Sequence, residues 1–190
     1  MFKTKILVLG MCRSGKTVVA NFLADATDYT VSDYRPTQGV RIVEFESSQL
    51  QINGKSVDAD VELWDCSGDR KFEKCWPAIQ FDASGIILVA CKQEANQQLQ
   101  ELEFWFVNFV QKCGIKHSNV RVYLVSKNDS SLPNDKEKIK LLPSMSHIQI
   151  FDVDLERGGD FLRNEFNNFL CSVITEISTQ RDKDEQGFIS

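Results

Sequence analysis

The chain has 190 residues, of which 22 are lysine or arginine and 27 are aspartate or glutamate, giving a formal net charge of −5 at pH 7. This length suits one domain with a core large enough for independent stability. The acidic balance argues against general nucleic-acid binding, which normally leaves a basic surface. No segment is long and apolar enough to predict a bilayer span. The 6 cysteines lack metal-site spacing and are expected to be reduced thiols in an intracellular protein.

Short apolar runs alternate with helical repeats along most of the chain, which predicts an α/β fold: a mostly parallel six-stranded sheet with helices on both faces. Asn53-Gly54 is a strong hairpin signal and predicts one antiparallel pair near the edge. We expect one domain over residues 1–180 and a charged, disordered tail over 181–190. The expected strands are Lys3–Leu9, Val40–Phe45, Val57–Trp64, Gly85–Cys91, Val120–Val125 and His147–Val153, and the expected helices are Thr17–Ala24, a short one ending near Pro77, Gln97–Cys113 and Asp160–Thr179.

Residues 10–17, between the first strand and the first helix, read GMCRSGKT and match the phosphate-binding pattern G-x-x-x-x-G-K-[ST]. The two glycines allow a tight turn in which successive backbone N–H groups point at an anion. The positive end of the following helix faces the same point. We therefore predict a P-loop, and the expected phosphate contacts are Gly10, Arg13, Ser14, Gly15, Lys16 and Thr17.

Within this loop, Lys16 is expected to reach the β- and γ-phosphates, and the Thr17 hydroxyl is expected to bind Mg²⁺. Arg13 is a candidate for a direct phosphate contact, with a solvated surface position as its alternative. Since ligands of such sheets bind beyond the carboxyl ends of the strands, partner motifs are expected at the same edge.

Three further stretches occupy that edge: Pro36-Thr37-Gln38-Gly39, Trp64-Asp65-Cys66-Ser67-Gly68 and Ser126-Lys127-Asn128-Asp129. With them, from about Lys3 to Ile177, the chain resembles the Ras-like small GTPases, and Rab proteins in particular. The resemblance implies a P-loop NTPase of the small G-domain type that binds GTP or GDP with Mg²⁺.

The same resemblance implies a role for each residue. Thr37 would bind Mg²⁺ and contact the γ-phosphate, and Asp65 would hold Mg²⁺ from the second shell. Gly68 would donate its backbone N–H to the γ-phosphate. Asp129 would accept hydrogen bonds from guanine, and Lys127 would pack along the base.

Several residues depart from the family pattern. Asp69 replaces the glutamine that orients the attacking water, and its charge is expected to face an anionic phosphate, so we predict slow or absent GTP hydrolysis. Cys12 stands at a position that is often glycine. Ser126 replaces the asparagine that braces the P-loop, and no S-A-K motif follows the last strand, so selectivity for guanine over other purines stays open.

Three longer blocks are more specific: FKTKILVLG with SGKTVVANFL, YRPTQGVRIVEF, and ELWDCSGDRKFEKCWPA. They resemble the Rab-like small GTPases that are subunits of intraflagellar transport complex B. This resemblance implies a role in cilium or flagellum assembly, docking on the coiled-coil subunits of that complex, and localisation to cilium or flagellum and cytoplasm. No lipid-anchor motif is visible, so a protein partner is expected to determine the location.

Aromatic residues on the helix Gln97–Cys113 extend beyond its core stripe, at Phe104 and Trp105. Together with Val107 they are expected either to form a protein interface or to reflect deeper burial of the helix. Trp76 is expected either to contact a partner in a nucleotide-sensitive way or to pack inward.

The leading hypothesis is a GTP-binding switch or GTP-bound scaffold subunit. One alternative is a turning-over P-loop NTPase or kinase, although no arginine-bearing lid or acceptor site is visible. Another is a pseudo-GTPase that keeps only the fold, which the intact set of Lys16, Thr17, Thr37 and Asp65 opposes.

Overall fold

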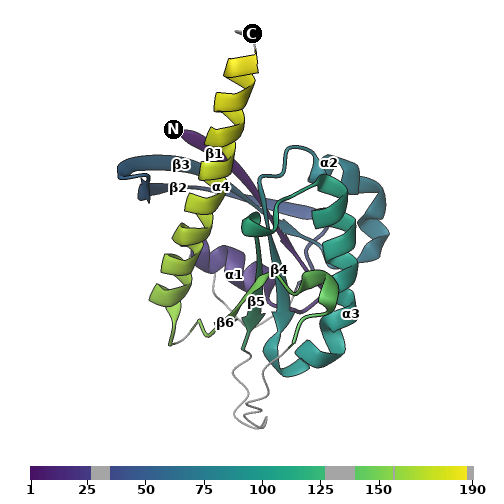
Figure 1. The fold of residues 1–190 in the computed structure, drawn as a ribbon. Helices are drawn as coiled ribbons and strands as arrows, with labels where there is room; N and C mark the ends of the chain where they lie inside the picture. Colours follow the sequence, from purple (N-terminus) through teal and green to yellow (C-terminus); the bar gives the residue numbers. More distant parts are fainter. Residues whose placement is uncertain (27–34, 127–139, 156, 188–190) are drawn as a thin grey trace.

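The structure, a computed structural model, describes residues 1–26, 35–126, 140–155 and 157–187 (Figure 1). It confirms the expected α/β fold, with a six-stranded sheet in the order β2-β3-β1-β4-β5-β6. The β2–β3 pair is antiparallel and the other neighbouring pairs are parallel. The strands are β1 (Phe2–Leu9), β2 (Val40–Ile52), β3 (Lys55–Cys66), β4 (Gly85–Cys91), β5 (Val120–Val125) and β6 (Gln149–Val153).

Helices cover both faces of this sheet (Figure 1). Alternate residues of β1 show the two layers: Ile6 and Val8 pack with α1 and α4, whereas Leu7 and Leu9 pack with α2 and α3. This alternation is the two-residue period of a strand buried on both sides. The helices are α1 (Lys16–Leu23), α2 (Trp76–Gln80), α3 (Ala95–Trp105) with a π-helical continuation (Phe106–Gln111), and α4 (Gly159–Gly187); short 3₁₀ turns lie at Arg70–Cys75, Lys92–Glu94, His117–Asn119 and Pro143–Met145.

The β2–β3 hairpin is longer than its sequence pattern predicted. Asn53 and Gly54 form the turn with φ angles of 50° and 75°, the positive values that a type I′ turn requires. A bulge between Ser47 and Leu50 interrupts the pairing, with Gln49 at a φ of 61°. The Gln49 amide donates to Asp58 Oδ1 at 3.0 Å, which holds the bulge. Because the bulge breaks the alternation of apolar residues, the predicted strand stopped short of it.

The short helix near Pro77 begins there rather than ending there. Pro77 occupies the first turn of α2. Proline is tolerated at this position because an N–H of the first turn has no partner inside the helix. The sequence prediction treated the proline as a stop, and this part of it was wrong.

The C-terminal helix also differs from expectation, because α4 continues to Gly187 where a disordered tail was predicted from residue 181. Its last turns project beyond the sheet (Figure 1). The Gln180 side-chain amide donates to Asp184 Oδ1 at 2.9 Å, one helical turn further on. The Arg181 guanidinium lies 5.6 Å from the centre of the Phe2 ring. These polar contacts extend the helix past its last core residues, so apolar periodicity could not mark its end.

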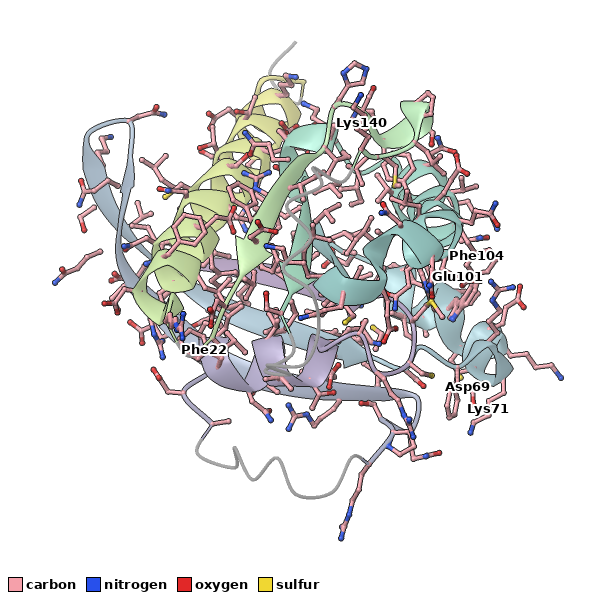
Figure 2. All side chains as sticks on the ribbon, turned by 90° about the horizontal axis from the view of Figure 1, so that it is seen from below. Phe22, Asp69, Lys71, Glu101, Phe104 and Lys140 are labelled. Atoms are coloured by element: carbon pink, nitrogen blue, oxygen red, sulfur yellow. The ribbon has the colours of Figure 1, made fainter. Side chains whose placement is uncertain are left out.

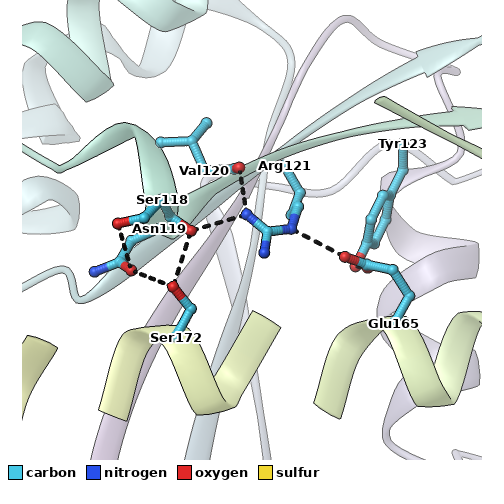
Figure 3. Close-up of polar contacts among 7 residues, drawn as sticks. All are labelled: Ser118, Asn119, Val120, Arg121, Tyr123, Glu165 and Ser172. Atoms are coloured by element: carbon cyan, nitrogen blue, oxygen red, sulfur yellow. Dashed lines mark hydrogen bonds and ion pairs between the residues drawn. The ribbon is translucent and has the colours of Figure 1, made fainter. Parts of the chain in front are cut away.

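A buried polar network attaches α4 to β5 (Figure 3). Arg121 Nε donates to Glu165 Oε1 at 3.0 Å, and the Tyr123 hydroxyl donates to Glu165 Oε2. The Arg121 Nη1 atom donates to the carbonyl oxygens of Ser118 and Val120 at 2.8 and 3.0 Å. Burial raises the pKa of Tyr123 well above its ordinary value, which keeps the phenol protonated as a donor. The Arg121, Tyr123 and Glu165 side chains therefore all have hydrogen-bond partners, and each depends on the others.

Removing Glu165 should destabilise the fold strongly. The Arg121 and Glu165 side chains are only 9% and 6% exposed, so Glu165→Ala leaves a buried cation without its partner. We expect a loss of about 3–5 kcal/mol in the free energy of unfolding, measured by urea denaturation. The control Glu176→Ala breaks the partly exposed pair with Lys116, whose side chains are 58% and 30% exposed, and should cost less than about 1 kcal/mol. Equal losses for the two variants would contradict this account.

Candidate functional site

The P-loop connects β1 to α1 at the carboxyl edge of the sheet, as the sequence predicted. Its backbone takes left-handed conformations, with φ of 148° at Gly10, 63° at Arg13 and 101° at Gly15. A Cβ atom at Gly10 would lie 2.2 Å from the carbonyl oxygen of Val89 in β4. At Gly15 it would lie 3.1–3.3 Å from the Val125 side chain at the end of β5. Both glycines are therefore required by the shape of the loop.

Two polar side chains of this loop are buried inside it. The Ser14 Oγ atom has no hydrogen-bond partner within the described part of the chain. Lys16 is 6% exposed, and its Nζ atom donates to the Met11 carbonyl at 2.6 Å. Burial lowers the pKa of Lys16 from its ordinary value, against the opposing effect of the Asp65 carboxylate. A buried cation beside an unsatisfied hydroxyl is an arrangement that an anionic ligand would complete.

Three side-chain oxygens from three separate segments meet beside the loop. Thr17, in the first turn of α1, donates to Asp65 Oδ2 at 2.7 Å. The Thr37 hydroxyl, which precedes β2, lies 3.3 Å from the Thr17 hydroxyl and 3.4 Å from Asp65 Oδ2. The sequence predicted these residues as the metal set, and the fold brings all three together.

Asp65 carries the main electrostatic cost of this cluster. It is 0% exposed at the end of β3, and its Oδ1 atom has no hydrogen-bond partner among the described residues. Burial raises the pKa of Asp65, although the Thr17 hydrogen bond and the charges of Lys16 and Arg41 act in the opposite direction. Arg41 Nε lies 3.9 Å from Oδ2. Arg41 was not anticipated, since its exposed position on β2 gave no signal in the sequence.

The donor set fits a hard divalent cation. Hydroxyl and carboxylate oxygens are the ligands that Mg²⁺ prefers, together with phosphate oxygens and water. In the described ranges, no group of three or more His, Cys, Asp or Glu side chains is arranged to hold a metal by itself. Thr17, Thr37 and Asp65 therefore suit a cation that arrives with a phosphate ligand.

Gly68 passes directly against the P-loop. A Cβ atom there would lie 2.3 Å from the Cys12 nitrogen and 2.7 Å from the Gly10 carbonyl oxygen. The Ser67 amide donates to the Gly39 carbonyl at 2.8 Å, which joins this segment to the one that carries Thr37. Only glycine fits at position 68, because the atoms it would meet are backbone atoms.

Asp69 has a different role from the one expected. The sequence placed its charge toward the phosphate site, but both carboxylate oxygens contact Lys71: Oδ1 accepts from the Lys71 amide and Oδ2 pairs with the Lys71 ammonium, each at 3.0 Å. These contacts lower the pKa of Asp69, the backbone hydrogen bond most of all. Figure 2 shows both residues at the margin of the molecule. Asp69 caps the 3₁₀ helix Arg70–Cys75.

The base-binding side is described only in part. The Ser126 amide donates to the Val153 carbonyl at 3.0 Å, which ties the end of β5 to β6. Lys127 and Asp129 lie outside the described residues, so their roles stay predictions. After β6, the Asp154 carbonyl accepts from the Gly158 amide at 2.8 Å, forming a turn where an S-A-K motif was sought.

The extra apolar residues of α3 and its π-helical continuation are buried to different degrees. Trp105 is 1% exposed, as deeper burial of the helix requires, whereas Val107 is 38% exposed and Phe104 is half-buried. Trp76 is 5% exposed and also packs inward. The π-helical turn that starts at Phe106 changes the helical phase, which a regular repeat could not predict. Within the described segments, no helix is both long and apolar enough to cross a membrane.

Comparison with known proteins gives consistent similarities. The family model "Ras of Complex, Roc, domain of DAPkinase" matches residues 5–129. The intraflagellar transport protein 22 homolog of Bos taurus is 39% identical over 190 residues, which is 100% of both chains. The GDP-bound crystal structure of T. brucei IFT22 is 27% identical, with a TM-score of 0.67 over 92% of this chain and 98% of that one. The GTP-bound crystal structure of T. brucei IFT22/74/81 is 27% identical, with a TM-score of 0.66 over 93% and 99%.

The contact between Gly68 and the P-loop predicts the effect of a single methyl group. Gly68→Ala should push the P-loop and the segment after β3 apart, since backbone atoms cannot move aside independently. We expect this steric clash to cost about 1–3 kcal/mol. The affinity for a guanine nucleotide should therefore fall roughly tenfold, measured by titration with a fluorescent analogue. Gly54→Ala is the control, because its Cβ would meet no atom within 4 Å although its φ is 75°. Undiminished affinity in Gly68→Ala would refute the proposed proximity.

Proposed function

Since this chain belongs to the family of intraflagellar transport protein 22 homologs, with a Roc-type small-GTPase domain, we propose that it binds a guanine nucleotide with Mg²⁺ and acts as a subunit of intraflagellar transport complex B. The observation that carries the proposal is the convergence of Thr17, Thr37 and Asp65 beside the P-loop. Among the described residues, Ser14 Oγ of this loop and Asp65 Oδ1 are buried without a hydrogen-bond partner. The GDP- and GTP-bound structures of T. brucei relatives support the same ligand class.

The P-loop residues supply the phosphate site. Backbone N–H groups from Arg13 to Lys16 form the cradle, and the start of α1 adds its positive end. The Lys16 ammonium, already buried within the loop, neutralises phosphate charge without a new desolvation cost. Ser14 Oγ gains a partner for a buried hydroxyl.

Mg²⁺, when bound, offsets the charge of the phosphate groups. The hydroxyl oxygens of Thr17 and Thr37 would hold it, and the Asp65 carboxylate, which accepts from both hydroxyls, would orient them. The Thr37 hydroxyl makes only long hydrogen-bond contacts with Thr17 and Asp65, at 3.3 and 3.4 Å. A cation bound by the two threonine hydroxyls would add a stronger interaction at this point. The conformation of the segment around Thr37 therefore depends on which nucleotide is bound.

GTP hydrolysis is slow in this proposal. The carboxylate of Asp69 is occupied by the backbone amide and ammonium of Lys71, so it does not orient a water molecule. A carboxylate is also a poorer neighbour for an anionic phosphate than the glutamine of related enzymes. The chain then stays bound to GTP for a long time and does not cycle rapidly between GTP and GDP.

Binding to partner proteins determines where in the cell this chain is located. The relative in the T. brucei IFT22/74/81 structure is bound to further intraflagellar transport proteins. This chain docks in the same way on coiled-coil subunits of complex B, in the cilium or flagellum and in the cytoplasm. A vestigial nucleotide site is less consistent with Asp65, because a buried carboxylate without ligand is an unfavourable group to retain.

The nucleotide that co-purifies with the protein tests the proposal directly. The protein is denatured and the released nucleotides are separated by chromatography. We expect GTP, because hydrolysis is slow. GDP would show that cleavage occurs despite Asp69, and ATP or a mixture would show relaxed base selectivity. An empty site that also fails to bind on titration would reject the function.

Asp65→Asn should remove the dependence of nucleotide binding on Mg²⁺. The amide keeps the shape of the carboxylate but loses the charge that orients the two threonine hydroxyls. Nucleotide dissociation in the presence of Mg²⁺ should be about 10–100-fold faster than in the original chain, and addition of EDTA should then change it little. The control Glu44→Gln, at an exposed position of β2, should keep the original response to EDTA.

A further inference from the structure

The whole sequence contains 2 histidines, and the fold brings them together although they are far apart in the chain. The ring centres of His117 and His147 lie 6.0 Å apart, and the two ring planes are inclined by 16°. These two residues are called the histidine pair below. Because neutral imidazole is the commonest metal ligand among side chains, such a meeting raises the question of a metal site.

The sheet topology explains why the two histidines meet. His117 lies in the 3₁₀ turn just before β5, and His147 lies just before β6. These strands are parallel neighbours, with Arg121 in register with Gln149. The amino ends of parallel strands meet at one edge of a sheet, and the P-loop follows the carboxyl end of the parallel strand β1. The histidine pair therefore lies at the edge away from the P-loop.

The backbone next to His117 is held by buried polar contacts (Figure 3). Arg121 Nη1 donates to the Ser118 carbonyl oxygen at 2.8 Å. The Ser172 hydroxyl of α4 donates to the same oxygen at 3.2 Å. The turn that carries His117 is thus fixed to both β5 and α4.

The backbone next to His147 is anchored by its neighbours. Met145 and Ile148 are 0% and 5% exposed, and the Ile148 amide donates to the Met145 carbonyl at 2.9 Å. The Ser144 hydroxyl donates to Glu103 Oε1 of α3 at 2.6 Å. Two ligands on fixed backbone lose little conformational entropy when they bind a common ion.

The rings themselves remain accessible. Both histidines are exposed, although the His117 ring also packs on buried Phe106 with 5.8 Å between ring centres. A metal ion about 2.1 Å from one nitrogen of each ring would place the ring centres about 5–6.5 Å apart, a range that includes the observed distance. The torsion that turns a histidine ring is soft, so a nitrogen of each ring can be turned toward one point.

The surrounding charges and ligand atoms indicate the class of ion. Lys116 precedes His117, but its Nζ atom pairs with Glu176 Oε1 at 2.6 Å, which offsets its repulsion of a cation. Imidazole nitrogens suit zinc, copper and nickel, whereas Mg²⁺ prefers oxygen. In the part of the chain that the structure describes, no third His, Cys, Asp or Glu joins the pair to make a larger metal-binding group.

We propose that His117 and His147 together bind one divalent transition-metal ion such as Zn²⁺, with water molecules in the remaining coordination positions. The bound ion links the amino ends of β5 and β6. This site is separate from the proposed nucleotide and Mg²⁺ site, and the inference does not depend on nucleotide binding.

Nitrogen-15 NMR of the imidazole rings tests this inference. The full chain, without a polyhistidine tag, is titrated with Zn²⁺ at neutral pH in excess Mg²⁺. Because the chain has 2 histidines, their ring signals separate binding at this pair from binding at cysteine thiols. We expect both rings to shift together and to saturate at one Zn²⁺ per chain. Rings that stay unshifted, or that shift at different Zn²⁺ concentrations, would overturn the inference.

Two variants identify the ligands. His117→Phe keeps a ring against Phe106 but has no ring nitrogen, and His147→Ala removes the other ligand. Each should weaken Zn²⁺ binding about 100-fold, because the advantage of two linked ligands is lost. Competition with a chromophoric chelator measures the affinity. The control Gln149→Ala, at an exposed position of β6, should bind like the original chain.

Urea denaturation without Zn²⁺ checks that each variant is folded. If His117→Phe does not fold, His147→Ala decides alone, because the His147 side chain is exposed. Unchanged Zn²⁺ affinity in a folded variant that lacks either imidazole would show that other groups hold the metal, and the inference would fail.

Discussion

The buried carboxylate of Asp65 is the constraint on which the site depends. It pairs in register with Val8 of β1 and Arg41 of β2, so it stands between the P-loop strand and the edge strand. A carboxylate without solvent exposure costs several kcal/mol unless charges and hydrogen bonds compensate for it. Thr17 compensates one oxygen and the other has no partner among the described residues. The fold thus keeps a locally unfavourable group at the place where a cation and a phosphate would satisfy it.

The two segments that flank Asp65 are stabilised by different kinds of interaction, polar contacts for one and aromatic burial for the other. Thr37 contacts the cluster at 3.3–3.4 Å through hydroxyl groups, which is near the limit of a useful hydrogen bond. Trp76, on the other side, is buried among aromatic rings of α3. Polar contacts of the first kind respond to an added charge, whereas burial of the second kind does not. A ligand at the P-loop would therefore act first on the polar contacts of Thr37.

Sequence patterns predicted the features that depend on local chemistry. The P-loop, the Asn53-Gly54 turn and the buried strands follow from residue types at fixed spacing, and the topology then brought Thr17, Thr37 and Asp65 together as expected. Features set by tertiary contacts were not predictable: the π-helical turn in α3, the extension of α4 and the start of a helix at Pro77. The roles of Lys127 and Asp129 stay predictions because they lie outside the described residues.

Asp69 follows Gly68 of the candidate site and caps the 3₁₀ helix Arg70–Cys75. A glutamine there would have no charge for the Lys71 ammonium and no carboxylate to cap the 3₁₀ helix. Aspartate is among the best residues at such a position, because its short side chain reaches the amide two residues on. The Asp69 carboxylate therefore stabilises the 3₁₀ helix whose first residue, Arg70, pairs with Glu101 of α3.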